Sequence, residues 1–266
     1  MAQRRRVLIT GAGSGLGQAL ALRYARSGAR VACIDLLGER AEATLALLAG
    51  DGHLALTADV GSDEAMQALH ERIGSEWGGV DVLINNAGIA SGGPMVETTM
   101  AEWQQVLNID LLSVVRGCRL FLPAMIAARS GQVLSTASFA GLASAPGIMT
   151  YGVAKAAVVA LSEQLRAEVQ QYGIRVGVIC PSFFRTNLCE SMVGSARMKG
   201  TAQKLMDVST DTLDSVADNV FAGAERGDFM IIPTRAEPMR WRLKRWFPEF
   251  YFRQVQKLAQ RSGLAQ

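Results

Sequence analysis

The chain has few residues of the kinds that bind metal ions or cross-link secreted domains. Its 266 residues include only four cysteines and two histidines. Neither His53 nor His70 stands in a cluster with carboxylates or cysteines, so we assign them no chemistry. The cysteines are scattered without the spacing of a metal site, at Cys33, Cys118, Cys180 and Cys189. We therefore expect reduced, structural thiols and no metal ion.

A long hydrophobic run is also lacking, although 49% of the residues are apolar. A membrane-spanning helix needs about 20 consecutive apolar residues, and no stretch approaches that length. The start of the chain, residues 4–10, is a strand-like segment too short to export or anchor it. These absences predict a cytoplasmic protein. Neither a repeat nor a linker divides residues 1–234, which we expect to form one domain, followed by an extension at residues 235–266.

Short apolar runs alternate with longer segments of helical periodicity. That alternation is typical of an α/β fold in which helices connect parallel strands. We therefore predict a Rossmann-like, doubly wound parallel sheet of about seven strands with helices on both faces. The expected strands lie near residues 5–10, 29–35, 53–58, 80–85, 131–137, 174–180 and 228–233. The expected helices lie near residues 15–27, 38–49, 62–77, 101–128, 151–172 and 213–226.

A glycine-rich turn joins the first predicted strand to the first helix. Residues 6–10 form the strand, and four glycines follow between residues 11 and 17. Glycine at such a turn lets a pyrophosphate approach the backbone, where the free amides of the helix bind it. Asp35 ends the second strand, where its carboxylate suits a ribose diol and repels a 2′-phosphate. Because no Lys or Arg interrupts the glycine turn, we predict NAD(H) in preference to NADP(H).

A tyrosine and a lysine four residues apart supply the chemistry of the predicted site. Tyr151 and Lys155 lie in an expected helix and project from one face of it. The ammonium group favours the ionised phenol, whose pKa is normally about 10, and Ser138 can hydrogen-bond a substrate oxygen. The phenol can then exchange a proton with an alcohol or a ketone. Ser135 lies on the opposite strand face, and only Ser138 stands thirteen residues before Tyr151.

In order and spacing, these motifs resemble those of the short-chain dehydrogenase/reductase (SDR) family over about residues 4–235. The resemblance implies a catalytic tetrad of Asn108, Ser138, Tyr151 and Lys155, in which Asn108 helps to hold a water that connects Lys155 to solvent. Without the resemblance, Asn108 would be a polar residue tolerated in a helix. The residues implied to bind the cofactor are Thr10, Gly11, Ser14, Gly15, Leu16, Gly17, Asp35, Leu36, Asp59, Val60, Asn86, Ala87, Gly88, Tyr151, Lys155, Pro181 and Thr186.

One departure from the family pattern follows Pro181. The family usually has glycine next, whereas this chain has Ser182, Phe183 and Phe184. We therefore expect a bulkier or stiffer wall beside the nicotinamide. Members of the family commonly pair through helices equivalent to residues 101–128 and 151–172, so the resemblance also implies a homodimer or homotetramer.

The substrate is indicated only by the apolar residues expected around the site. By resemblance, a Met-rich segment at residues 187–212 closes the pocket, and its expected wall includes Pro94, Ala140, Ile148 and Met192. These side chains favour a hydrophobic secondary alcohol or its ketone or aldehyde, although a Met-rich segment can also be simple adaptable packing. Two alternatives stay open: a reductase of carrier-linked 3-oxoacyl groups, and a non-catalytic protein that senses dinucleotides.

The C-terminal extension is not explained by the resemblance. Residues 235–266 carry eight of the 27 Lys and Arg residues but only two of the 24 Asp and Glu residues. Large aromatic residues are concentrated between Trp241 and Phe252, and Pro248 is expected to divide two short amphipathic helices. Peripheral contact with an anionic membrane is one interpretation. The other is that the aromatic residues pack on a partner subunit or cover the active site. We expect no nucleic acid partner.

Overall fold

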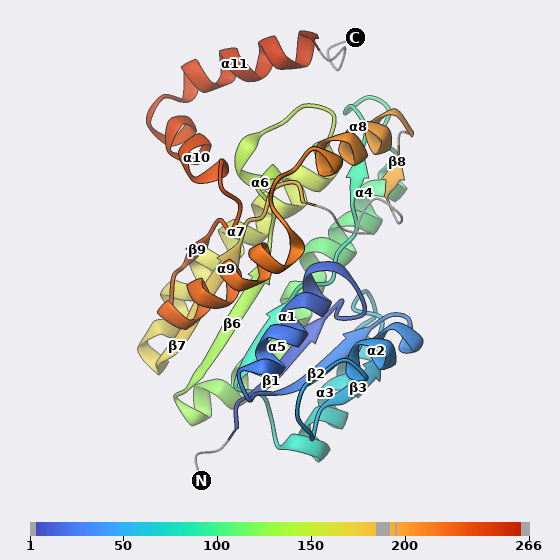
Figure 1. Cartoon of the computed structure of the whole chain (residues 1–266), viewed down its shortest axis with the longest axis vertical. Coiled ribbons are helices and arrows are strands. Elements are labelled where there is room, and N and C mark those ends of the chain that lie inside the picture. Colours follow the sequence, from blue (N-terminus) through green and yellow to red (C-terminus); the bar gives the residue numbers. More distant parts are fainter. Residues whose placement is uncertain (1–3, 185–191, 195, 262–266) are drawn as a thin grey trace.

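A parallel sheet between two layers of helices forms the body of the protein in the computed structural model, which describes residues 4–184, 192–194 and 196–261 (Figure 1). The seven strands have the order β3-β2-β1-β4-β6-β7-β9, and every pair is parallel. The prediction of a doubly wound α/β fold is therefore confirmed. The strands are β1 (Arg6–Thr10), β2 (Arg30–Asp35), β3 (Leu54–Thr57), β4 (Val82–Asn85), β6 (Gly131–Thr136), β7 (Ile174–Ile179) and β9 (Met230–Ile231).

The helices agree with the predicted segments, with some additions. The expected helix at residues 101–128 is interrupted by a π-helical turn, Asn108–Leu112, and the one at 151–172 ends in a 3-10 turn, Gln170–Tyr172. The helices are α1 (Gly15–Arg26), α2 (Gly38–Leu45), α3 (Asp63–Trp77), α4 (Met100–Leu107), α5 (Ser113–Ala128), α6 (Ala140–Ala143), α7 (Met149–Val169), α8 (Ala196–Asp207), α9 (Leu213–Arg226), α10 (Glu237–Trp246) and α11 (Pro248–Arg261).

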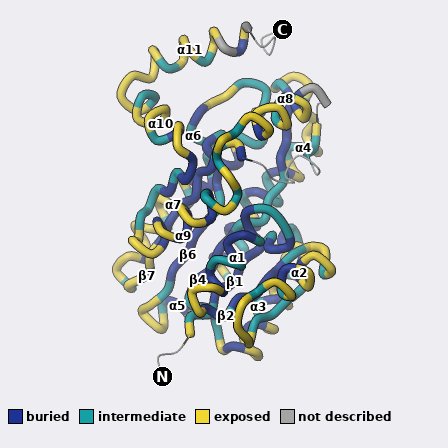
Figure 2. The backbone as a smooth tube through the Cα atoms, viewed as in Figure 1, coloured by how far each residue is buried: buried dark blue, intermediate teal, exposed yellow. Residues whose placement is uncertain are grey.

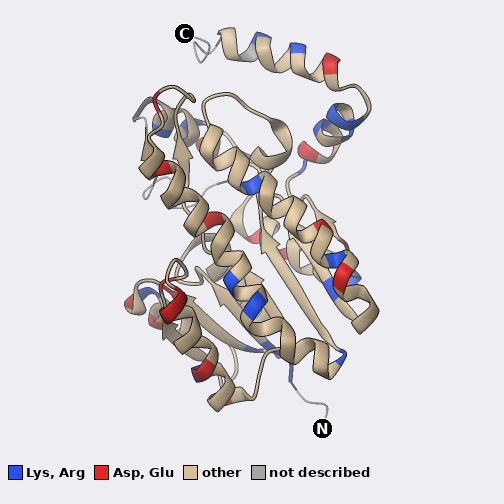
Figure 3. Cartoon of the chain, turned by 180° about the vertical axis from the view of Figure 1, so that it is seen from behind, with Lys and Arg blue, Asp and Glu red and all other residues tan. Residues whose placement is uncertain are grey.

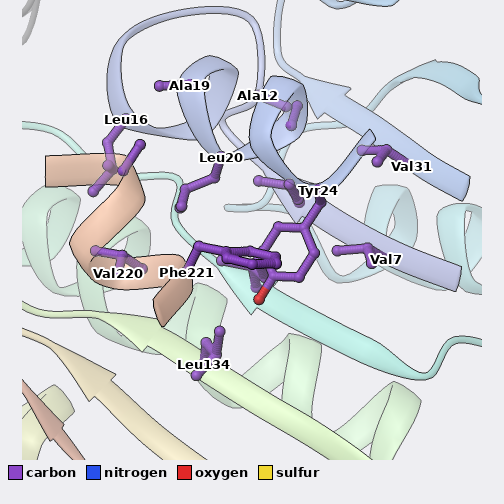
Figure 4. Packing of buried hydrophobic residues seen from close by; sticks show 14 of the residues in the cluster. Val7, Ala12, Leu16, Ala19, Leu20, Tyr24, Val31, Leu134, Val220 and Phe221 are labelled. Atoms are coloured by element: carbon purple, nitrogen blue, oxygen red, sulfur yellow. The ribbon is translucent and has the colours of Figure 1, made fainter. Parts of the chain in front are cut away.

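Both faces of the sheet are buried because its strands are apolar at nearly every position. On one face, Tyr24 of α1 and Phe221 of α9 meet edge to face with ring centroids 5.0 Å apart (Figure 4). On the other face, α3, α5 and α7 contribute residues such as Met66, Phe121 and Val158 to a second core. Burial on both faces explains the lack of the period-two polar pattern that marks a sheet with one wet face.

The helical stretch Met100–Ala128 is long and apolar enough, by composition, to cross a membrane. Its inner face is buried, however, since Val114, Phe121 and Met125 belong to the second core. Gly117 allows a close approach to β4, because a Cβ atom at that position would lie 2.2 Å from Asn85 Oδ1. These contacts identify the stretch as a core segment of the α/β body.

The carboxyl ends of the strands bring the predicted motifs to one edge of the sheet. The glycine turn follows β1, Asp35 ends β2, and Asn86 follows β4. Ser138 and Pro181 follow the neighbouring strands β6 and β7. Ligands of open α/β sheets bind beyond this edge, so the fold positions these residues around one candidate site.

The extension is helical, and Pro248 separates its two helices as expected. Helix α10 contacts α6, whereas α11 projects away from the body at the same end of the molecule as α8 (Figure 1). Much of α11 is exposed, in contrast to the strands and inner helix faces (Figure 2). We refer to α10 and α11 together as the C-terminal arm.

Candidate active site

The glycine turn keeps the N-terminus of α1 open to an anion. Gly11 and Gly15 have φ angles of 65° and 52°, in the left-handed region that favours glycine. A Cβ atom at Gly17 would lie only 2.1 Å from Gly11 O, so a side chain there would fill the turn. Ser14 precedes the helix but makes no side-chain capping hydrogen bond, and the first turn holds no acidic residue. The amides of this turn are thus suited to a pyrophosphate.

The Asp35 carboxylate faces the glycine turn and accepts hydrogen bonds from two backbone amides. Its Oδ2 atom accepts a hydrogen bond of 2.9 Å from Gly13 N, and its Oδ1 atom accepts one of 3.1 Å from Leu37 N. Leu36, between them, is 62% exposed. Helix α2 also brings Arg40 beside the turn, since a Cβ atom at Gly13 would lie 2.5 Å from Arg40 Cβ. The sequence gives no sign of this basic neighbour, because Arg40 lies outside the glycine turn and reaches it only through the packing of α2.

A network of hydrogen bonds joins the ends of β1 and β4. Thr10 Oγ1 accepts hydrogen bonds from Asn86 N at 3.0 Å and from Ala87 N at 3.1 Å. Asn86 Nδ2 donates to Thr10 O and Gly11 O, and Asn86 Oδ1 accepts from Thr136 Oγ1. Asn86 therefore holds the glycine turn in place and leaves Gly88 next to Lys155.

Asp59 and Val60 form the neighbouring part of this edge. Asp59 Oδ1 accepts a hydrogen bond of 2.7 Å from Gly61 N, which closes a turn after β3. Val60 is nearly buried, and its carbonyl oxygen accepts from Arg116 Nη1 at 3.3 Å. The pair offers an apolar surface beside a carboxylate, which is compatible with an adenine ring.

Ser138, Tyr151 and Lys155 lie together at the carboxyl ends of β6 and the start of α7. The Ser138 hydroxyl lies close enough to the Tyr151 phenol to lower its pKa. Ser138 Oγ accepts a hydrogen bond from Ala140 N at 3.1 Å and donates one to Pro181 O at 3.4 Å. Lys155 is 3% exposed, with its Nζ atom 5.7 Å from the centre of the Tyr151 ring and 3.1 Å from Thr136 O.

A buried carboxylate that the sequence analysis did not select lies beside this lysine. Asp110, in the π-helical turn, is fully buried, and its Oδ2 atom is 3.7 Å from Lys155 Nζ. Asp110 Oδ1 accepts a hydrogen bond of 2.8 Å from Ile89 N. Oδ2 has no hydrogen-bond partner within the part of the chain that the structure describes. In the sequence, the position of Asp110 between the apolar residues Ile109 and Leu111 could have indicated a buried acid.

The Asn108 side chain makes hydrogen bonds on both sides of the π-helical turn. Asn108 Nδ2 donates to Gly61 O at 3.0 Å, and Asn108 Oδ1 accepts from Arg116 Nη2 at 2.8 Å. Its side chain therefore ties the π-helical turn to the turn after β3, while Asp110 makes the side-chain contact with Lys155. The predicted role of Asn108, in helping to hold a water that connects Lys155 to solvent, stays a prediction.

The electrostatics of Tyr151 also differ from the expectation. Burial raises the pKa of the phenol above its ordinary value, and the negative charge of Asp110 raises that pKa further, while the hydrogen bond from Ser138 lowers it. Burial likewise raises the pKa of Asp110, against the opposing effects of Lys155 and Ile89 N. We expected the positive charge of Lys155 to favour the phenolate, but the negative charge of Asp110, 3.7 Å from Lys155, acts on the phenol in the opposite direction.

Some of the residues expected around the substrate lie close to one another. Gly93 forms a β-bridge with Ile148, directly before Pro94. The short strands β5 (Ser91–Gly92) and β8 (Val193–Gly194) pair, and Met192 Cε would lie 2.5 Å from a Cβ atom at Gly92. Ala140 begins α6, which packs on α7 beneath Tyr151. Thr186 lies outside the described residues.

The aromatic pair after Pro181 is divided between core and surface. Phe184 is 7% exposed and packs in the first core, with Leu16 and Val216, while Phe183 is partly exposed. Pro181 O accepts a hydrogen bond of 2.8 Å from Phe139 N, which joins this segment to the turn after β6. The bulk of Phe184 therefore fills the core, in place of the bulkier pocket wall that we expected from it.

The comparisons with known proteins point in one direction. A family model described as short chain dehydrogenase matches residues 5–195. The chain is 35% identical over 185 residues to a probable oxidoreductase, EphD, of Mycobacterium tuberculosis, and this match covers 68% of the chain but 31% of the relative. It is 36% identical to D-threitol dehydrogenase of Mycolicibacterium smegmatis, over 68% of the chain and 70% of that protein. The chain thus spans less than a third of EphD but most of the threitol enzyme.

Solved structures resemble the whole body of the protein. A short chain dehydrogenase/reductase from Burkholderia phymatum in complex with NAD matches with a TM-score of 0.85 and 26% identity, over 93% of this chain and 95% of that one. A short-chain dehydrogenase from Sphingobium yanoikuyae in complex with NADPH matches with a TM-score of 0.75 and 26% identity, over 95% of this chain and 94% of that one.

Proposed function

Because this chain belongs to the short-chain dehydrogenase family of oxidoreductases, we propose that it transfers hydride between NAD(H) and a hydrophobic secondary alcohol or its ketone or aldehyde. The observation that carries the proposal is the cluster of Ser138, Tyr151 and Lys155 at the sheet edge where the glycine turn opens. A protein that only senses dinucleotides has no need of a hydrogen-bonded serine and tyrosine at that place.

The residues at the edge fit a dinucleotide cofactor. The uncapped N-terminus of α1 would hold the pyrophosphate, Asp35 the adenosine ribose, and Asp59 and Val60 the adenine. Pro181 and Lys155 lie where the nicotinamide end would be held. The bound nicotinamide supplies the hydride chemistry, by accepting or donating two electrons and one proton as hydride.

Side chains of the protein transfer the remaining proton. Ser138 orients the substrate oxygen, and the Tyr151 phenolate accepts the hydroxyl proton during oxidation, or the phenol donates it during reduction. Lys155 carries the positive charge that stabilises the phenolate. We propose Asp110 as the residue that holds Lys155 in position, since the two charged groups are buried together at 3.7 Å.

The preference for NAD(H) is supported by the Asp35 carboxylate, which faces the glycine turn and would repel a 2′-phosphate. Arg40 opposes this preference because it lies beside the same turn. Asp35 is hydrogen-bonded to the turn itself, so we propose that its repulsion of a 2′-phosphate exceeds the attraction by Arg40.

We propose a hydrophobic substrate because the residues expected around the pocket are apolar or small, and two of them, Ile148 and Met192, lie beside Gly93 and Gly92. One relative is a D-threitol dehydrogenase, which is named for a small polar polyol. A short diol or polyol is therefore the second candidate, and it requires hydrogen-bond donors or acceptors beyond Ser138 and Tyr151.

The test is NADH formation from NAD+ with the full chain, over secondary alcohols of increasing apolar size and over short polyols, with NADP+ in parallel. We expect rates that rise with apolar size and need NAD+. Tyr151→Phe should lower kcat at least about 100-fold while leaving NAD+ binding near that of the parent protein. Substantial activity in that variant would refute the proposed proton transfer, and activity only with NADP+ would favour the reductase of carrier-linked 3-oxoacyl groups.

A further inference from the structure

The C-terminal arm concentrates the exposed aromatic side chains of the protein. Trp246, Phe247, Phe250 and Phe252 lie within seven residues and are 74%, 61%, 52% and 53% exposed. Elsewhere in the described chain, Phe183 is the one Phe, Tyr or Trp among the exposed large apolar residues. The interpretation that these rings cover the chain's own active site is therefore wrong for these four residues.

The same arm is strongly basic on its exposed surface. Arg242, Arg245, Arg253 and Lys257 are exposed, and the basic residues of α10 are visible as a group in Figure 3. Of the two acidic residues on the arm, Glu237 is 5% exposed and pairs with Arg240 at 3.3 Å. Glu249 is the other acidic residue. The outward charge of the arm is thus mainly positive and lies beside the aromatic rings.

The base of the arm is fixed to the wall of the candidate active site. Lys244 Nζ donates to Leu142 O and, at 2.7 Å, to Ser144 Oγ, which lie in and after α6. These residues follow Ser138 by only a few positions. Helix α10 is therefore attached to the body, and it carries α11 at the same end of the molecule.

A second exposed apolar segment lies at the same end of the molecule. The connection between β5 and α4 exposes Met95 and Val96, and Met100 begins α4 with 71% of its surface exposed. This connection follows Gly93, which pairs with Ile148 near the candidate substrate site. In Figure 1 it lies toward the end of the molecule from which α11 projects.

We propose that the C-terminal arm binds the surface of an anionic lipid bilayer. Tryptophan and phenylalanine side chains are suited to the headgroup boundary, and basic side chains beside them are attracted to anionic headgroups. A partner subunit would cover the rings equally well, but the four exposed basic groups would then need acidic partners, whereas an anionic bilayer supplies them along its whole surface. The proposal does not depend on the reaction catalysed.

Sedimentation of the full chain with vesicles tests this proposal. We expect the protein to pellet with phosphatidylcholine vesicles that contain about a third phosphatidylglycerol and to stay largely in solution with phosphatidylcholine alone. Arg242→Gln with Arg253→Gln should weaken the partition coefficient about tenfold or more. The matched control, Arg26→Gln with Arg72→Gln, removes two exposed charges from the body and should not change it.

A second variant separates the lipid surface from a second copy of the chain. Trp246→Ser with Phe250→Ser should reduce pelleting and leave the oligomeric state in sedimentation velocity unchanged. The control Leu47→Ser, which replaces an exposed residue outside the arm, should change neither measurement. Equal pelleting with neutral and anionic vesicles, or none with either, would overturn the proposal. Dissociation of an oligomer in the double variant, without loss of vesicle binding, would assign the rings to a partner subunit and would also overturn it.

Discussion

Asp110 and Lys155 are buried with their charged groups 3.7 Å apart, and burial together with the charge of Asp110 sets the pH response that we expect of Tyr151. The carboxylate of Asp110 raises the pKa of the phenol, in the same direction as burial does. Asn at position 110 would keep an oxygen for the hydrogen bond from Ile89 N but would lose the charge. The substitution therefore isolates the electrostatic contribution of Asp110.

We predict that Asp110→Asn moves the acidic limb of the alcohol-oxidation profile to lower pH by about one unit. Oxidation needs the phenolate, and removal of a nearby negative charge lowers the pKa at which the phenolate forms. The measurement is kcat/KM against pH, with Asp51→Asn as a control, since Asp51 is exposed and pairs with Arg4 on another part of the surface. A limb that moves to higher pH, or stays in place, would contradict this role.

The proposed preference for NAD(H) depends on Asp35, and Arg40 lies beside the same turn. We predict that Asp35→Ser raises the ratio of kcat/KM for NADP+ to that for NAD+ at least about tenfold, because the carboxylate that repels a 2′-phosphate is lost while Arg40 remains. Asp35→Ser with Arg40→Ala should lose much of this gain. An unchanged ratio in the single variant would show that Asp35 does not select the cofactor.

Individual residues differ in how well the sequence predicts them. The spacing of Tyr151 and Lys155 predicts their common helix face because α7 is regular there. Asp110 was not selected, because its approach to Lys155 depends on the π-helical turn between α4 and α5, which departs from the 3.6-residue period. Arg40 was missed because its nearness to Gly13 depends on the packing of α2 against the turn.

At the scale of elements, the contact between α6 and α7 gives a direct prediction for stability. A Cβ atom at Gly141 would lie 2.6 Å from both Lys155 C and Ala156 N, which are backbone atoms that cannot move aside cheaply. We predict that Gly141→Ala lowers the free energy of unfolding by about 1–3 kcal/mol and also reduces activity, because it displaces the backbone of Lys155.

The control for this substitution is Gly74→Ala in α3. No atom lies within 4 Å of the Cβ position there, so alanine should raise the free energy of unfolding by about 0.5–1 kcal/mol through its helix propensity. Chemical denaturation of both variants measures the difference. Equal stabilities would show that α6 moves away from α7 more easily than the contact indicates.

Elements of the sheet could be predicted because each main strand is an apolar run between turn residues, as in residues 30–35. The pair β5 and β8 could not, since strands of two residues carry too little pattern and are specified by pairing across a hundred residues. Helix α6 is similarly short, with four residues between Phe139 and Ser144. Its place depends on packing against α7 and on the arm.

For the whole molecule, the alternation of strands and helices predicts a doubly wound parallel sheet, whereas the order of its strands comes from the structure. The position of the C-terminal arm could not be predicted, because its amphipathic pattern is compatible with several kinds of cover. The structure excludes burial of Trp246 and Phe250 against the chain's own body. The proposed contact with an anionic bilayer would account for a basic arm on a chain whose remainder is slightly acidic.

The bond between Lys244 and the end of α6 has a consequence for biosynthesis. Lys244 lies 102 positions after Leu142, and the ribosome releases the chain from its N-terminus. The strands up to β7 can therefore pair while translation continues, but the loop beside Ser138 receives this partner only when the final helices emerge. A chain truncated shortly before residue 237 would therefore contain all seven strands of the sheet but would lack the lysine that binds the end of α6.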